Sequence, residues 1–82
     1  MNVVAFLPVR LSEAALVNAA TTITEAKAQA LAERCVPGTG TASDAVCVVC
    51  PADGDAERFG GPRSRWGAPL ARAVHRAVLE RL

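Results

Sequence analysis

Aromatic residues are scarce in this sequence, with two Phe, one Trp and no Tyr among 82 residues. So few rings argue against a platform on which single-stranded bases stack. An excess of charge of one sign is also lacking, because nine Lys and Arg and eight Asp and Glu leave a formal net charge of +1. Nucleic-acid-binding domains usually carry a concentrated basic face. We therefore expect no nucleic-acid partner.

Long hydrophobic runs are missing too. The apolar run Val3–Leu7 is too short for a membrane span or a signal-peptide core. The nearest positive charge, Arg10, follows this run instead of preceding it. We predict a cytoplasmic protein without a membrane segment.

Cysteine and histidine, which form disulfides and bind metals, are also few, with three Cys and one His. An odd cysteine count without a secretion signal argues against a disulfide framework. Cys47 and Cys50 have CxxC spacing but lie in an apolar, β-branched run, where residues three apart point to opposite faces of a strand. We interpret these two, and Cys35, as packed core residues. His75 lies on the flank of the last helix, and no metal site is predicted.

The sequence does contain two apolar strands and two helical patterns. Strands are expected at 2–9 and 45–50, helical pattern at 12–34 with Ser12 as the N-cap, a long loop at 51–66, and a last helix from Gly67. The β-branched patch at 21–24 is able to break the first helix. Thr22 and Glu25 have capping-box spacing. One bent helix and two separate helices both remain open.

The order strand, helix, strand, helix indicates a small two-layer α/β unit. Both strands are continuously apolar, which is typical of strands buried on two faces. Two strands do not make a self-sufficient sheet, and each leaves an unpaired edge. We therefore interpret residues 1–82 as a partial domain. It would be completed by an N-terminal half, a separate subunit or self-association.

Lys27 falls in the middle of the apolar face of the first helical pattern. At 3.6 residues per turn it shares that face with a group of apolar residues, Leu16, Ala20, Ile23, Ala30 and Leu31. Burying an ammonium costs free energy unless it is paired. Lys27 therefore reaches water past Leu31, pairs with a structural carboxylate, or points into a site. Glu25 falls on the opposite, polar side, as a cap or a functional acid.

The segment Gly38–Thr41 has the composition of an anion-binding loop. Glycines permit positive φ, so that successive N–H groups converge on one oxygen. Thr39, Thr41 and Ser43 add hydroxyl groups and Asp44 adds an acceptor, although such stretches are also plain turns. In a parallel sheet this loop would lie at the amino end of the second strand, whereas ligands bind at the carboxyl ends. Either the sheet is mixed or this loop is not the usual kind of ligand site, and we predict a mixed sheet.

Taken in order, these segments resemble the adenosylcobinamide amidohydrolase (CbiZ) family. The specific ones are Thr24–Lys27 and Gly38–Asp44. The supporting ones are Ala15–Asn18, Gln29–Leu31, Gly60–Pro62, Trp66–Gly67 and Ala73–His75. The resemblance covers nearly all of the chain and places it in the C-terminal part of the family's domain. Family members are roughly twice this length or more.

The resemblance implies an enzyme of corrinoid salvage. It would hydrolyse the amide between the corrin ring and aminopropanol to give adenosylcobyric acid for cobalamin synthesis. No cofactor is expected, because the corrinoid substrate carries its own cobalt. Alternatives are an inactive truncated remnant, or a non-catalytic half of a split enzyme that binds a corrinoid or a partner.

Amide hydrolysis needs a base, donors for the tetrahedral oxyanion and an acid for the leaving amine. We hypothesise that Gly38–Thr41 supplies the oxyanion donors and that Asp44 or Glu25 is the base. Lys27 would hold a carboxylate or donate to the oxyanion. Thr39 or Thr41 is an alternative nucleophile. The remaining candidate substrate-binding residues are Gly38, Gly40, Ser43 and Arg63.

Overall fold

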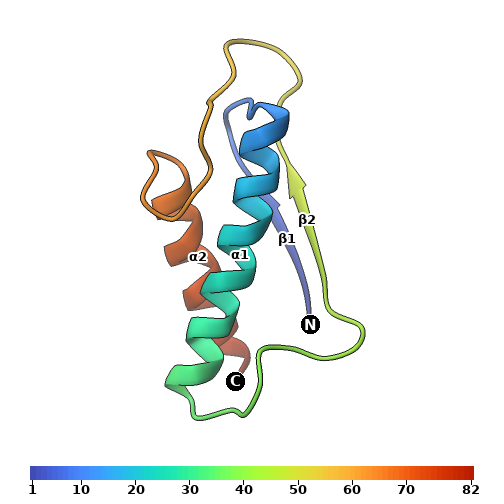
Figure 1. The fold of residues 1–82 in the computed structure, drawn as a ribbon, viewed down its shortest axis with the longest axis vertical. Coiled ribbons are helices and arrows are strands. Elements are labelled where there is room, and N and C mark those ends of the chain that lie inside the picture. The colour runs from blue at the N-terminus through green and yellow to red at the C-terminus, as the bar shows by residue number, and fades with distance from the viewer.

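Four elements make up the computed structural model, which describes all of residues 1–82. They are β1 (Asn2–Phe6), α1 (Glu13–Glu33), β2 (Ala45–Val49) and α2 (Gly67–Arg81). The two helices lie side by side, and the strands pair next to α1 (Figure 1). The predicted order of elements is confirmed. Neither helix is long and apolar enough to cross a membrane.

The first helical pattern forms one continuous helix, α1, of 21 residues. Ser12 caps it as predicted, because its hydroxyl accepts a hydrogen bond from the Ala15 N–H (3.1 Å). The capping-box interpretation of Thr22 and Glu25 is wrong. Thr22 is buried, and its hydroxyl donates to the Gly60 carbonyl (2.7 Å) instead of capping a second helix.

The sheet is parallel, so the prediction of a mixed sheet is wrong. β1 pairs with β2 in a register that sets Asn2 opposite Ala45 and Phe6 opposite Val49. The reason is the connection. α1 runs back along the sheet and returns the chain to the end at which β1 began, so both strands point the same way (Figure 1).

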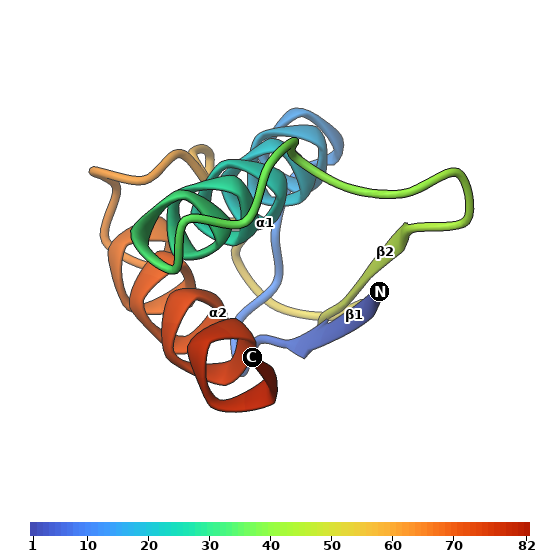
Figure 2. The same cartoon turned by 90° about the horizontal axis from the view of Figure 1, so that it is seen from below.

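Only one face of the sheet is covered. Side chains alternate along both strands, and the covered set is Val3, Ala5, Leu7, Val46, Val48 and Cys50. The other face carries Val4, Phe6, Cys47 and Val49, which are exposed. Phe6 keeps 77% of its surface in water. Burial on two faces is therefore not found, because both helices lie on the same side of the sheet (Figure 2).

The cysteines divide in the same way. Cys47 lies on the open face and Cys50 on the half-buried face, so these thiols point apart as expected. The expectation that Cys47 packs in the core is wrong, because the open face has no covering layer. Cys35 is also exposed, and it ends α1 in a left-handed conformation (φ 56°).

The core lies between the helices and the covered face of the sheet. Small residues on α1, including Ala15 and Ala19, are completely buried and let other segments approach closely. The long loop uses this space, because Gly60 packs directly on the α1 backbone. Glu57 also ties the loop to residues 10–12 through two backbone hydrogen bonds. The loop is therefore anchored at two points.

Gly60→Ala is expected to destabilise the fold, whereas Gly61→Ala is not. A Cβ at Gly60 would lie 2.5 Å from the Ala15 carbonyl oxygen, whereas one at Gly61 would meet nothing within 4 Å. Overpacking of this kind costs about 1–3 kcal/mol. Thermal unfolding followed by circular dichroism should show a lower Tm for Gly60→Ala only. Equal Tm values for the two variants would contradict the packing of this loop on α1.

Candidate functional site

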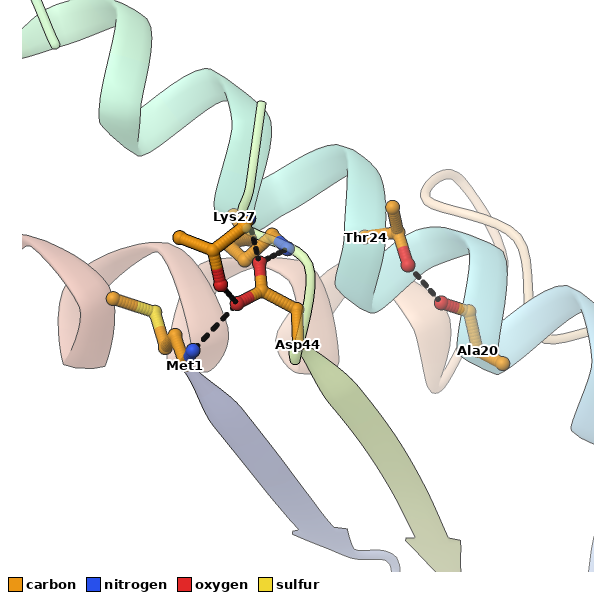
Figure 3. A network of polar contacts seen from close by, with 6 residues as sticks. Met1, Ala20, Thr24, Lys27 and Asp44 are labelled. Carbon is orange, nitrogen blue, oxygen red and sulfur yellow. Dashed lines mark hydrogen bonds and ion pairs between the residues drawn. The ribbon is translucent and has the colours of Figure 1, made fainter. Parts of the chain in front are cut away.

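Polar groups of Met1, Lys27 and Thr41 converge on Asp44, which stands immediately before β2 (Figure 3). Its Oδ2 accepts hydrogen bonds from Lys27 Nζ (2.7 Å) and the Thr41 N–H (3.1 Å). Its Oδ1 accepts from the Thr41 hydroxyl (2.6 Å) and the Met1 amino group (2.5 Å). A carboxylate has about four acceptor positions, so four donors occupy Asp44 fully.

Lys27 is placed by α1 and lies among apolar neighbours. Its side chain is 7% exposed, and that of Asp44 is 14% exposed. Three surroundings were considered for the Lys27 ammonium, and in the structure it pairs with a carboxylate. Asp44 is the only acceptor that the ammonium contacts, which leaves two of its three N–H bonds without a protein partner. The pair therefore holds an ammonium in a partly desolvated position, with donor capacity to spare.

Gly40 makes this arrangement possible. A Cβ at this position would lie 2.4 Å from Asp44 Oδ2 and 3.0 Å from Lys27 Nζ. Any larger residue would therefore displace the ion pair. Gly38 has a positive φ of 87°, a backbone conformation suited to glycine. Gly40 thus lets the loop cross the ion pair at backbone distance.

Hydrogen bonding holds the pKa of the Asp44 carboxyl far below its usual range. Lys27 makes the largest contribution, followed by the Met1 amino group and Thr41. Asp44 is therefore ionised at every physiological pH. The same donors make it a weak proton acceptor, because a carboxylate with so low a pKa binds a proton poorly.

The low pKa predicts how stability changes with pH. Unfolding restores the ordinary pKa of 3.8, so the stabilisation from Asp44 is complete above that value. It is lost as the pH falls through the much lower folded-state pKa. We expect wild type to be more stable than Asp44→Asn at pH 7, with a difference that shrinks as the pH falls from about 4 to 2. Urea unfolding at several pH values measures this. A constant difference would contradict the charged cluster.

The remaining sequence-predicted residues are only partly brought together. Thr39 and Ser43 lie exposed in the same loop as Thr41, without hydrogen bonds to the cluster. Glu25 is exposed on α1 and belongs to no ion pair or side-chain hydrogen bond. Arg63 lines a separate depression beside Asn18 and Phe59. None of the residues that contact Asp44 lines this depression. The candidate site therefore centres on Lys27, Thr41 and Asp44.

The location of the cluster follows from the parallel sheet. Asp44 precedes β2 and Met1 precedes β1, so the cluster lies at the amino ends of both strands (Figure 3). This end is opposite to the usual ligand site of doubly wound sheets. The Met1 contact was not predicted, because it depends on the parallel register. That register places Met1 next to Ala45, whose N–H donates to the Met1 carbonyl (3.4 Å).

The histidine and the cysteines form no second site. His75 Nε2 lies 2.9 Å from Glu33 Oε1, which joins α2 to the end of α1. No three His, Cys, Asp or Glu side chains gather as metal ligands would. The chemistry visible in this structure is that of a partly buried ammonium, a carboxylate that is ionised at physiological pH and an adjacent hydroxyl.

The molecule is a small α/β unit in which one carboxylate holds an ammonium and a hydroxyl. Comparison with known families identifies it more closely. The model of the family described as adenosylcobinamide amidohydrolase matches residues 1–82. The chain belongs to this family, as the sequence resemblance predicted. Searches of curated proteins and of solved structures found no match.

Proposed function

We propose that this chain carries the hydrolytic site of an adenosylcobinamide amidohydrolase. The reaction is cleavage of the amide that joins the corrin ring to aminopropanol. Its product is adenosylcobyric acid, and its role is cobinamide salvage for cobalamin biosynthesis. The family match over the whole chain supports the substrate class, and the Lys27–Asp44–Thr41 cluster supports the chemistry. The cobalt belongs to the substrate.

The observation that carries the proposal is the pairing of Lys27 with Asp44 beneath the Gly38–Thr41 loop. As the amide carbon becomes tetrahedral, negative charge develops on its oxygen. A fixed ammonium stabilises that charge most strongly where water is excluded. We assign this role to the free N–H groups of Lys27. Asp44 holds the ammonium in place.

Thr41 is the hydroxyl that the arrangement favours over Thr39. Its O–H donates to Asp44, which leaves the oxygen lone pairs free to accept a hydrogen bond from the N–H of the substrate amide. Thr39 has no such partner. We propose that Thr41 lies against the scissile amide and that Asp44 fixes its orientation. Asp44 is the carboxylate of the site in preference to Glu25, which lies exposed on α1.

A second candidate function is supported by the bare face of the sheet. Exposed Val4, Phe6 and Val49 are suited to contact with a partner polypeptide or with the apolar edge of a corrin ring. In this alternative the chain binds a corrinoid or a partner without cleaving the amide. The two functions differ in whether aminopropanol is released.

The test is an assay of both products. The purified chain is incubated with adenosylcobinamide, alone and together with the N-terminal half of a longer family member. Mass spectrometry then follows adenosylcobyric acid and aminopropanol. We expect adenosylcobyric acid and aminopropanol to form in equal amounts in at least one of the two incubations. Corrinoid binding without aminopropanol under both conditions would favour the binding function and contradict the proposed activity.

A further inference from the structure

A groove of about 550 Å³ runs between β1 and α2, on the side of β1 that faces away from β2. Its walls are mainly apolar. They include Val4 and Phe6 from β1, Ala73 and Ala77 from α2, and Trp66 at one end. Figure 2 shows why the space is open. α2 packs beside α1 and extends past the free edge of β1, where no further strand lies beneath it.

The free edge of β1 carries unpaired backbone groups. The Leu7 N–H donates to the Val49 carbonyl, and the Met1 carbonyl accepts from the Ala45 N–H. The backbone N–H and C=O groups of the odd-numbered residues of β1 therefore point toward β2. N–H and C=O directions alternate along a strand. Val4 and Phe6 therefore turn their N–H and C=O groups outward, along the groove. An edge of this kind is a template for one more strand.

The charge of the groove is one-sided. Arg81 is the only residue with a charged side chain among the lining residues, and none of them is acidic. α2 runs opposite to β1, so Arg81 lies at the end where β1 begins (Figure 1). An inserted strand is therefore best matched by apolar side chains along its length and a carboxylate at the Arg81 end.

We propose that this groove binds an extended apolar segment of another polypeptide, added as a third strand to β1 with an acidic residue against Arg81. This mode of recognition combines main-chain hydrogen bonds with pockets for alternate side chains. A second copy fits less well. Its β1, Asn2–Phe6, contains no Asp or Glu and therefore offers no carboxylate to Arg81. Binding in this groove does not depend on the proposed hydrolysis.

The test uses a soluble heptapeptide, acetyl-Thr-Val-Thr-Val-Thr-Val-Asp, and the full 82-residue chain. Trp66 is the single tryptophan and lines the groove, so its fluorescence reports occupancy directly. We expect a saturable change in Trp66 emission. The same peptide ending in Lys should bind at least about ten times more weakly, because it places a positive charge beside Arg81. Arg81→Glu should reverse that preference.

Val4→Pro is the discriminating variant. Proline removes only an N–H that points into the groove, and so leaves the β1–β2 ladder intact. Val4→Ala is the matched control, because it shortens the same side chain and keeps the N–H. We expect Val4→Pro to lose peptide binding while Val4→Ala retains it, with circular dichroism confirming that both variants are folded.

Three outcomes would overturn the proposal. The first is no Trp66 response to millimolar peptide in wild type. The second is equal binding by Val4→Pro and Val4→Ala. The third is a dimer, seen by sedimentation without peptide and dissociated by Val4→Pro, because a second copy would then occupy the groove. None of these results depends on hydrolysis of a corrinoid.

Discussion

Asp44→Asn is expected to slow hydrolysis of adenosylcobinamide by about a hundredfold or more. An amide at this position keeps the shape of the carboxylate but removes its negative charge. Lys27 then loses its only ionic partner, and the Thr41 hydroxyl loses a charged acceptor. The initial rate of adenosylcobyric acid formation measures the effect, in the preparation in which wild type is active.

Asp55→Asn is the matched control for this experiment. Asp55 is exposed in the long loop and takes part in no ion pair, so the same chemical change should leave the rate unaltered. The two variants therefore separate loss of the cluster from loss of one negative charge. Near-normal turnover by Asp44→Asn would remove Asp44 from the reaction.

Lys27→Met is expected to reduce hydrolysis by a similar factor while preserving the fold. Methionine fills the same apolar face of α1, but it offers no donor to a developing oxyanion. The substitution also removes the largest cause of the low Asp44 pKa, so that pKa should rise toward its ordinary value. Carbon-13 NMR of the Asp44 carboxyl measures the shift, and the product assay measures the rate.

The double variant, Lys27→Met with Asp44→Asn, separates catalysis from stability. Removing one member of a desolvated ion pair leaves an uncompensated charge, whereas removing both leaves none. We expect the double variant to be more stable than the sum of the two single changes predicts, although hydrolysis stays lost. Recovery of activity together with stability would show that the pair has only a structural role.

Local patterns in the sequence predicted most of the fold. Ser12 followed by a long apolar period locates the start of α1, and β-branched runs locate both strands. Helical periodicity also placed Lys27 on the buried face, and composition marked the Gly38–Asp44 loop. These features depend on residues that are neighbours in the chain, so a sequence pattern is sufficient to recognise them.

What depended on distant contacts was harder to predict. Thr22 was interpreted as a helix cap from its spacing to Glu25. Its actual partner, the Gly60 carbonyl, lies 38 residues away, where no local pattern can show it. The parallel register places Met1 beside Asp44, and no local pattern encodes that proximity. The open face of the sheet was missed for a related reason. Continuous apolar strands indicate burial on two faces, yet only one covering layer is present.

The most direct test of the central claim is an NMR titration of the nitrogen-15-labelled chain with adenosylcobinamide. The claim is that the corrinoid amide is presented to Lys27, Thr41 and Asp44. We expect the largest shifts at the amides of residues 38–44 and at the Lys27 side chain, and their absence in Gly40→Ala, whose Cβ would displace the ion pair. Shifts confined to β1 and α2, with residues 38–44 unchanged, would contradict the account.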